Sequence, residues 1–192
     1  GEDEIPGKAA DGAKALIDEL HSALDPKAYR KAVALLAESE FIDIFGVENS
    51  LTPAMDLFTK LGYLGLTCRL NTDAYLQQIG AGHLPHGAVA VAFSHSGSSA
   101  DTVKALRLAK SHGAKTIAIT NAIGAPLASW ADVTLLTGRD SHTIYGNAIF
   151  SRVADTALVD MLYMGVILSG YGRFSTALDE SGRMIRDRVF EN

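Results

Sequence analysis

Short apolar runs alternate with amphipathic stretches along most of this chain. The apolar runs are typical of buried strands, and the stretches between them repeat apolar residues at the three-to-four-residue spacing of helices. We expect strands at 41–45, 66–70, 88–93, 115–120 and 133–136. We expect helices at 7–23, 26–39, 53–64, 72–81, 102–111, 126–130, 145–168 and 175–190.

This alternation predicts an α/β fold, a three-layer α/β/α sandwich with a five-stranded parallel sheet, because crossover helices cover both faces of such a sheet. We expect leading helices over 1–40 to pack on a core over 41–170, and a C-terminal helix to follow over 171–192. Ligands of parallel sheets bind beyond the carboxyl ends of the strands. The loops 46–52, 94–99 and 120–125 are predicted to lie there.

A hydroxyl-rich turn joins the third predicted strand to its helix. It carries Ser94, Ser96, Ser98 and Ser99 around Gly97. The first N–H groups of a helix have no partner within it and, with the macrodipole, favour an anion. Serine hydroxyls donate to phosphate oxygens, and glycine lets the backbone come close. The turn therefore predicts a phosphate site, although serines that merely cap the helix are the alternative.

The other two loops offer further polar candidates. Ser50 follows the first strand and either binds the same anion or caps the next helix. Glu48 would repel a phosphate, so it either points away or serves sugar hydroxyls. His95 is either an acid, base or donor, or an outward-facing turn residue. We expect possible sugar contacts from Glu48, Asn49, His95, Ser98, Asn121 and His142.

Composition excludes several functions. The 192 residues have a net charge of −5, which argues against a nucleic-acid surface within this chain. Cys68 is the single cysteine, so an internal disulfide is excluded and a reducing, cytoplasmic location is expected. The sequence has no membrane-length apolar run, dinucleotide fingerprint or P-loop, and its histidines lack convincing metal spacing. We therefore expect no cofactor, no metal and no membrane partner.

These motifs resemble the sugar isomerase (SIS) domain, a flavodoxin-like fold that binds phosphosugars. The turn Ser94-His95-Ser96-Gly97-Ser98-Ser99 matches the family's phosphate loop. The first-strand loop, Gly46-Val47-Glu48-Asn49-Ser50, keeps the family's serine but has Glu48 in place of its second glycine. The resemblance covers about Phe41 to Leu168. It implies that Ser50, Ser94, Ser96 and Ser99 bind phosphate.

A segment of the long predicted helix resembles RpiR-type bacterial transcription regulators. Ser151-Arg152-Val153-Ala154 is followed by Leu158-Val159-Asp160-Met161-Leu162, as in the helix of that group. The resemblance implies an SIS effector domain, with DNA bound only through a helix-turn-helix domain absent from this chain. It also implies a homodimer or higher homo-oligomer, which fits a helix that is apolar on nearly every side.

The expected function is to sense a phosphorylated sugar or sugar acid without making or breaking bonds. The alternative is a phosphosugar aldose–ketose isomerase, which needs a positioned Glu or His as base. SIS isomerases usually place such residues on later helices, and the chain carries neither between Phe150 and Leu168. We therefore expect no catalytic residue, and the sensor is favoured over the enzyme.

Overall fold

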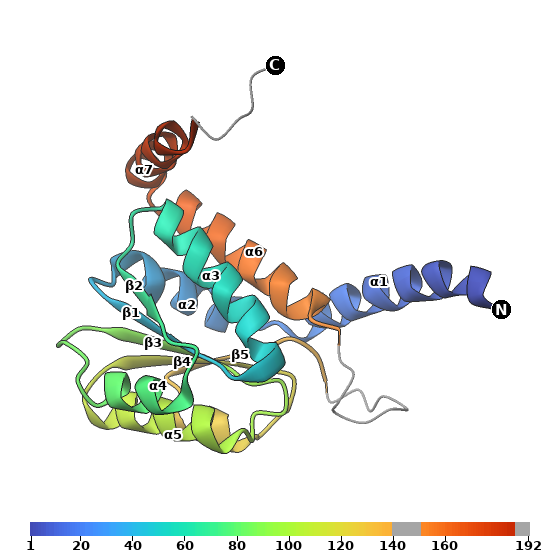
Figure 1. Cartoon of the computed structure of the whole chain (residues 1–192), viewed down its shortest axis with the longest axis horizontal. Coiled ribbons are helices and arrows are strands. Elements are labelled where there is room, and N and C mark those ends of the chain that lie inside the picture. The colour runs from blue at the N-terminus through green and yellow to red at the C-terminus, as the bar shows by residue number, and fades with distance from the viewer. Residues whose placement is uncertain (140–150, 187–192) are drawn as a thin grey trace.

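The computed structural model describes residues 1–139 and 151–186. Its centre is a five-stranded parallel sheet in the order β2-β1-β3-β4-β5 (Figure 1). The strands are β1 (Ile42–Phe45), β2 (Cys68–Leu70), β3 (Val89–Phe93), β4 (Lys115–Thr120) and β5 (Val133–Leu136). Each lies inside a predicted apolar run, so the predicted parallel sheet is confirmed.

Helices cover both faces of the sheet and complete the three predicted layers (Figure 1). One face carries α2 (Pro26–Glu38), α3 (Leu51–Tyr63) and α6 (Val153–Ser169). The other face carries α4 (Ala74–Ala81), α5 (Ala100–Ser111) and the 3₁₀ turn η3 (Pro126–Trp130). Further 3₁₀ turns are η1 (Glu2–Glu4) and η2 (Glu48–Ser50).

The two faces of β3 differ in side-chain size. Val89, Val91 and Phe93 point into the larger core under α2, α3 and α6. Ala90 and Ala92 point into the smaller core under α4 and α5. Alternate residues of a strand face opposite sides of the sheet. The large side chains of β3 therefore fill the core on one face, and its small side chains let the helices on the other face pack close to the sheet.

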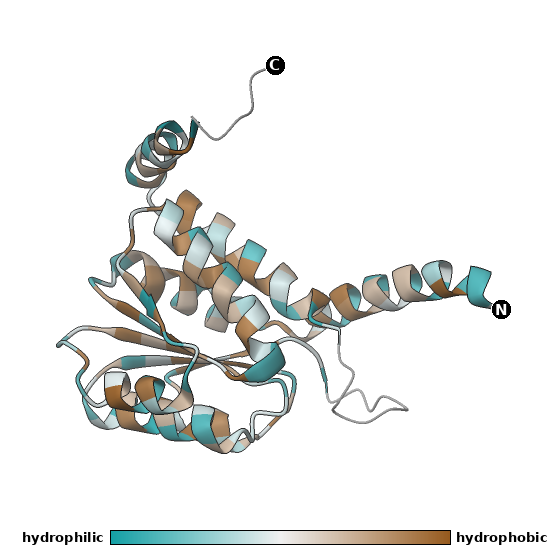
Figure 2. Ribbon diagram, viewed as in Figure 1, coloured by the Kyte–Doolittle hydropathy of each residue, from teal (hydrophilic) through white to brown (hydrophobic). Residues whose placement is uncertain are grey.

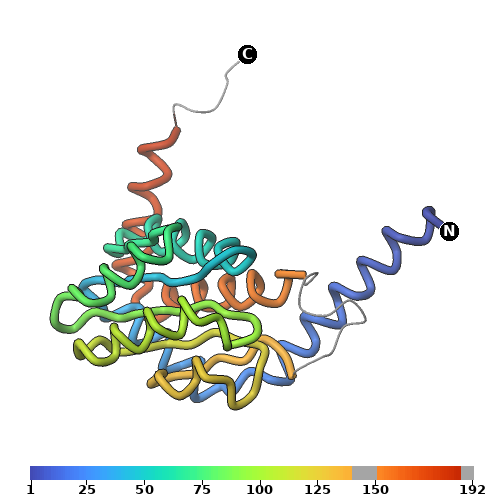
Figure 3. The backbone as a smooth tube through the Cα atoms, turned by 60° about the horizontal axis from the view of Figure 1, so that its bottom comes forward, coloured from blue at the N-terminus to red at the C-terminus, as the bar shows by residue number. Residues whose placement is uncertain are grey.

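Two helices project from the body. α1 (Ile5–Ala23) extends away from the sheet with Leu20 as its buried residue, and α7 (Tyr171–Met184) buries Phe174 (Figures 1 and 3). Both are amphipathic, whereas α6 is hydrophobic along most of its length (Figure 2). α1 therefore depends on contacts near its C-terminal end.

The last two predicted helices need correction. The helix expected at 145–168 begins at Val153, after Arg152 at the N-cap position; 145–150 lie outside the described residues. The helix expected at 175–190 begins at Tyr171 and ends at Met184, and 187–190 lie outside the described residues. Gly170, with φ −149° and ψ 54°, breaks the helical path, so the next helix starts directly after it.

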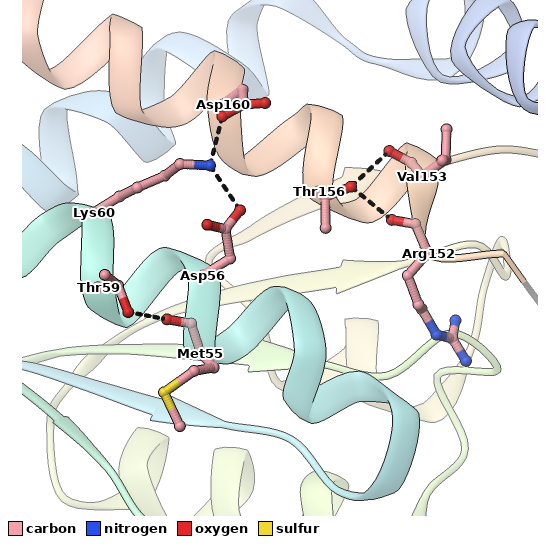
Figure 4. Close-up of polar contacts among 8 residues, drawn as sticks. All are labelled: Met55, Asp56, Thr59, Lys60, Arg152, Val153, Thr156 and Asp160. Atoms are coloured by element: carbon pink, nitrogen blue, oxygen red, sulfur yellow. Dashed lines mark hydrogen bonds and ion pairs between the residues drawn. The ribbon is translucent and has the colours of Figure 1, made fainter.

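Asp160, which interrupts the apolar stretch of α6, forms a contact between helices. Lys60 of α3 donates to Asp56 one turn earlier at 2.7 Å and to Asp160 of α6 at 2.5 Å (Figure 4). The Lys60–Asp160 ion pair joins α3 to α6 beside the core. Among the described residues no single helix is long and apolar enough to cross a membrane; α6 and α7 reach that length only as a pair bent by 116°.

A buried ion pair holds the edge strand β2 to β1. Asp43 is 1% exposed and accepts hydrogen bonds from Arg69 Nε at 3.0 Å and Nη2 at 2.6 Å. Burial raises the pKa of Asp43, and the Arg69 guanidinium opposes that rise. Gly80 leaves room for the guanidinium, since a Cβ there would lie 2.6 Å from Arg69 Nη2.

We expect Arg69→Met to lower the free energy of unfolding by about 3 kcal/mol, because Asp43 would be left buried and unpaired. The loss should be smaller at about pH 4.5 than at about pH 7.5, because the native state of the variant takes up a proton on Asp43 before the unfolded chain does. Urea unfolding at both pH values measures this. Arg107→Met, which removes an arginine stacked on Trp130, is the control and should cost about 1 kcal/mol or less. An equal loss in the two variants would contradict the role of the ion pair.

Candidate ligand-binding site

The carboxyl ends of four strands meet at one edge of the sheet. The register pairs Phe45 of β1 with Ala92 of β3, and Thr120 of β4 with Leu136 of β5. The chain leaves β1 toward β2 on one side and leaves β3 toward β4 on the other. The gap between β1 and β3 is thus the topological switch point, where open α/β sheets bind their ligands.

The serine turn lies at this switch point. It begins with Ser94, which is 4% exposed and whose N–H donates to Ile119 of β4 at 3.0 Å. The N–H of Gly97 returns to the Ser94 carbonyl at 3.0 Å, which closes a tight turn. Gly97 adopts φ +61°, and its carbonyl accepts from Leu127 of η3 at 2.9 Å. The turn is therefore fixed from three sides.

No side chain other than hydrogen fits at Gly97. A Cβ there would lie 2.3 Å from the Ala125 Cβ and 2.8 Å from Thr120 Oγ1. The positive φ alone favours glycine, and the close approach of η3 and β4 requires it. This contact sets the path of the backbone that leads into α5.

The hydroxyls of the turn make weak contacts with one another. Ser96 Oγ accepts from the Ser98 N–H at 3.3 Å, and Ser98 Oγ donates to the Ser96 carbonyl at 3.2 Å. Ser99 occupies the N-cap of α5 without a side-chain capping bond, and its Oγ accepts from Thr102 at 3.4 Å. Ser99 therefore makes no side-chain capping bond to α5, and the contacts of the Ser96 and Ser98 hydroxyls lie within the turn.

The loop after β1 carries the second predicted serine. Ser50 is half-buried at the N-cap of α3, again without a side-chain capping bond to that helix. The adjoining Glu48 has φ +51°, in the left-handed region that favours glycine. This backbone geometry explains why the related motif has glycine at the position of Glu48. Glu48 and Asn49 are exposed to solvent.

His95 and Asn121 come together from two loops. The His95 carbonyl accepts from the Asn121 N–H at 3.0 Å and from Thr120 Oγ1 at 3.1 Å. The Asn121 side-chain nitrogen lies 3.4 Å from His95 Nε2. His95 is half-buried and Asn121 is 6% exposed, so His95 is not a fully outward-facing turn residue. His142 lies outside the described residues.

Sequence reasoning missed the residue that positions the loop after β1. Gln77 of α4 is 1% exposed. Its Nε2 donates to the carbonyls of Gly46 and Asn71, both at 2.7 Å, and its Oε1 accepts from the Gly46 N–H at 3.2 Å. A glutamine on an amphipathic helix gives no signal in sequence, because burial of its amide depends on which loop packs above it.

Arg152 lies at the start of α6, where its Nη1 is 3.5 Å from Asp155 Oδ2. Burial raises the pKa of the Asp155 carboxyl despite this arginine. The Nε and Nη1 of Arg152 are buried and have no hydrogen-bond partner in the described structure. Figure 4 shows the side chain extending from the start of α6 away from that helix.

The described part of the chain offers little for metal or thiol chemistry. No group of His, Cys, Asp and Glu among the described residues could hold a metal ion. Cys68 is half-buried, and burial raises the pKa of its thiol to about 12, so the nucleophilic thiolate is suppressed at neutral pH. The chemistry that the site does offer is recognition of an anion by hydroxyls and a helix N-terminus.

Known proteins resemble this chain over most of its length. An HTH-type transcriptional regulator of Caldanaerobacter subterraneus is 30% identical over 96% of this chain and 66% of its own length. The regulator HexR of Escherichia coli is 28% identical over 96% of this chain and 64% of its own length. The chain thus spans about two thirds of the length of these two relatives.

Solved structures share the fold. The NanR protein of Vibrio vulnificus, complexed with ManNAc-6P, has a TM-score of 0.90 at 24% identity, covering 97% of this chain and 70% of its own. The sugar isomerase domain of an RpiR transcription factor from Sphaerobacter thermophilus has a TM-score of 0.85 at 22% identity. The match covers 94% of this chain and 99% of that domain. A Methanococcus jannaschii protein with an inferred 3-hexulose-6-phosphate isomerase function has a TM-score of 0.72 at 14% identity. The match covers 91% of this chain and 97% of that protein's chain. These likenesses confirm the fold.

The SIS domain family matches residues 35–165, which include every strand of the sheet, the serine turn and most of α6. The chain therefore belongs to the SIS domain family.

Proposed function

We propose that this chain is a phosphosugar-sensing effector domain of a transcription regulator. The observation that carries the proposal is the serine turn at the switch point, where Ser99 stands at the α5 N-cap without a side-chain capping bond. The first N–H groups of a helix have no partner within it, so together with the serine hydroxyls they can bind an anion. Relatives named as HTH-type transcriptional regulators support the regulatory role. The ManNAc-6P bound to NanR supports a phosphosugar as the ligand class.

The phosphate end of the ligand is assigned to Ser50, Ser94, Ser96, Gly97 and Ser99. The α5 N-terminus supplies partial positive charge there, and Gly97 keeps the backbone close to the ligand. Asp101 in the first turn of α5 accepts from Gln78 at 3.1 Å, which helps to hold that carboxylate to α4. The sugar or sugar-acid end then lies toward His95 and Asn121, which the structure brings together.

An isomerase is the second candidate, favoured by the isomerase function inferred for the Methanococcus jannaschii protein of the same fold. Proton transfer between two sugar carbons needs a base within hydrogen-bond reach of the carbon. α6 carries no glutamate or histidine over Val153–Ser169. Among the site candidates in the described residues, His95 and Glu48 remain as bases, and Glu48 is exposed. The sensor is therefore the better proposal.

The whole protein would bind DNA through a helix-turn-helix domain outside this chain, as the names of the relatives support. The net charge of −5 agrees with a domain that does not itself contact DNA. We further propose a cytoplasmic homodimer or higher homo-oligomer. Met164 and Leu168 of α6 are 52% and 68% exposed, and a second copy would cover them.

A thermal-shift screen tests the proposal with hexose, pentose and amino-sugar phosphates, sugar-acid phosphates and the unphosphorylated parents. A ligand at about 100 times its Kd should add about 2.7 kcal/mol of stability. We expect the phosphate to be required. NMR of the same samples separates the two candidates, because a sensor leaves the sugar unchanged and an isomerase converts it. The absence of any stabilising phosphate would refute both.

Removing one hydroxyl of the turn should weaken binding. We expect Ser96→Ala to cost about 1.5–3 kcal/mol of binding free energy, because a charge-assisted hydrogen bond to phosphate is lost. Isothermal titration with the best phosphate from the screen measures this. Ser111→Ala at the far end of α5 removes a hydroxyl that donates to Leu108, and it should leave affinity unchanged. Equal affinity in both variants would remove Ser96 from the site.

Filling the space at Gly97 should disrupt the turn. We expect Gly97→Ala to lower the free energy of unfolding by about 3 kcal/mol, through backbone strain and overlap with Ala125. Gly113→Ala is the matched control, since Gly113 has φ +86° but nothing within 4 Å of a Cβ, so about 1 kcal/mol is expected there. Thermal and urea unfolding measure both. Comparable losses of unfolding free energy in the two variants would show that backbone strain alone, without crowding, explains the requirement for glycine at 97.

A further inference from the structure

The C-terminal half of α1 is tied to the loop that follows β5. Glu19 Oε1 accepts a hydrogen bond from the Arg139 N–H at 2.7 Å. Arg139 Nη2 donates in turn to the Ser22 carbonyl at 3.0 Å. Leu20 is buried in the core nearby, whereas residues 1–12 are exposed. The helix is therefore held by a short stretch of contacts at one end.

The same loop packs against the candidate sugar end of the site. At Gly138 a Cβ would lie 2.1 Å from Asn121 Oδ1 and 3.3 Å from the Glu19 carboxyl carbon. One small volume thus brings together the amide of Asn121, the backbone of Gly138 and the carboxylate of Glu19. Any side chain at 138 would push Asn121 and Glu19 apart.

Asn121 connects this point to the serine turn. Its N–H donates to the His95 carbonyl, and its side-chain nitrogen lies 3.4 Å from His95 Nε2. Its Oδ1 is buried, and it accepts no hydrogen bond within the described structure. Thr137, just before Gly138, donates its N–H to the Thr120 carbonyl at 3.0 Å, so the loops after β4 and β5 are also joined through the backbone.

We propose that Glu19 couples the sugar end of the site to α1, so that the order of α1 reports the bound ligand; this rests on the proposed phosphosugar function. A sugar that contacts the Asn121 amide changes what packs against Gly138 and Glu19. The hydrogen bonds from Arg139 then tighten on α1. Because α1 has few buried contacts, little free energy separates its ordered form from its locally unfolded form. A small change at Glu19 therefore shifts the equilibrium between these two forms of α1 substantially.

Hydrogen exchange of backbone amides in α1 tests the coupling. The probes are N-acetylmannosamine 6-phosphate, glucose 6-phosphate and ribose 5-phosphate, with inorganic phosphate as the probe of the phosphate end alone. A sugar phosphate that binds should slow exchange at residues 14–24 by about twofold or more. Inorganic phosphate should not, because it does not reach Asn121. Titration calorimetry on the same samples establishes which probes bind.

Variants separate coupling from binding. We expect Glu19→Ala to bind the sugar phosphate while losing its effect on exchange at residues 14–24. Glu19→Gln keeps an acceptor for the Arg139 N–H and should retain the effect. Asp18→Ala is the matched control, because it removes a neighbouring exposed carboxylate from the same helix and should leave the response intact.

The two proposals fail in different ways. If no sugar phosphate binds the wild-type chain, the phosphosugar function is wrong, and the coupling fails with it. If a sugar phosphate binds and exchange at residues 14–24 is unchanged or faster, the coupling alone is overturned. A response that persists in Glu19→Ala would show that another contact, such as Leu20, carries the signal, and it would overturn the role of Glu19.

Discussion

The close approach of backbone at Gly97 is the constraint on which the site depends. The serine turn, η3 and the end of β4 meet there with no space for a Cβ. Because the turn cannot move away from η3 without losing the hydrogen bond from Leu127 to Gly97, the serines stay directly before the α5 N-terminus. An anion site built from weak individual donors works only if their positions are fixed in advance, since ordering them on binding would cost free energy.

An acidic chain can hold a phosphate in this way without an arginine or lysine at the turn. The net charge of −5 is spread over the molecule, and exposed charges more than about 10 Å away are largely screened. The helix N–H groups and hydroxyls act at contact distance, where their dipoles outweigh the distant charge. The nearest carboxylate in the helix, Asp101, is held by Gln78. The phosphate recognition that we propose would thus rest on uncharged donors close to the ligand.

Much of this fold follows from local sequence, and the exceptions have physical causes. Five apolar runs and the Gly97 turn predict the parallel sheet and its candidate phosphate site, because period and turn chemistry are local properties. Tertiary geometry is not a local property, because it depends on segments that are distant in the sequence. Three features arise in this way: the positive φ of Glu48, the buried amide of Gln77 and the crowding at Gly138. Within the described part of the helix predicted over 145–168, residues 151 and 152 are not helical and α6 begins at Val153, because apolar content does not reveal where a helix begins.

Position in the sheet explains why a ligand at this edge can influence a distant helix. β3, β4 and β5 are adjacent, so the loops after them form a row, and contacts pass from His95 through Asn121 to Gly138. α1 meets the end of that row at Glu19 rather than the middle of the sheet. A ligand can bias α1 only if it binds more tightly to one arrangement of this row than to another. The row is closely packed at Gly138, so small displacements there make atoms overlap. Such packing favours a change between distinct arrangements of the loops over their gradual deformation. The row therefore has the physical property that a sensor requires, and an isomerase would have no need of it.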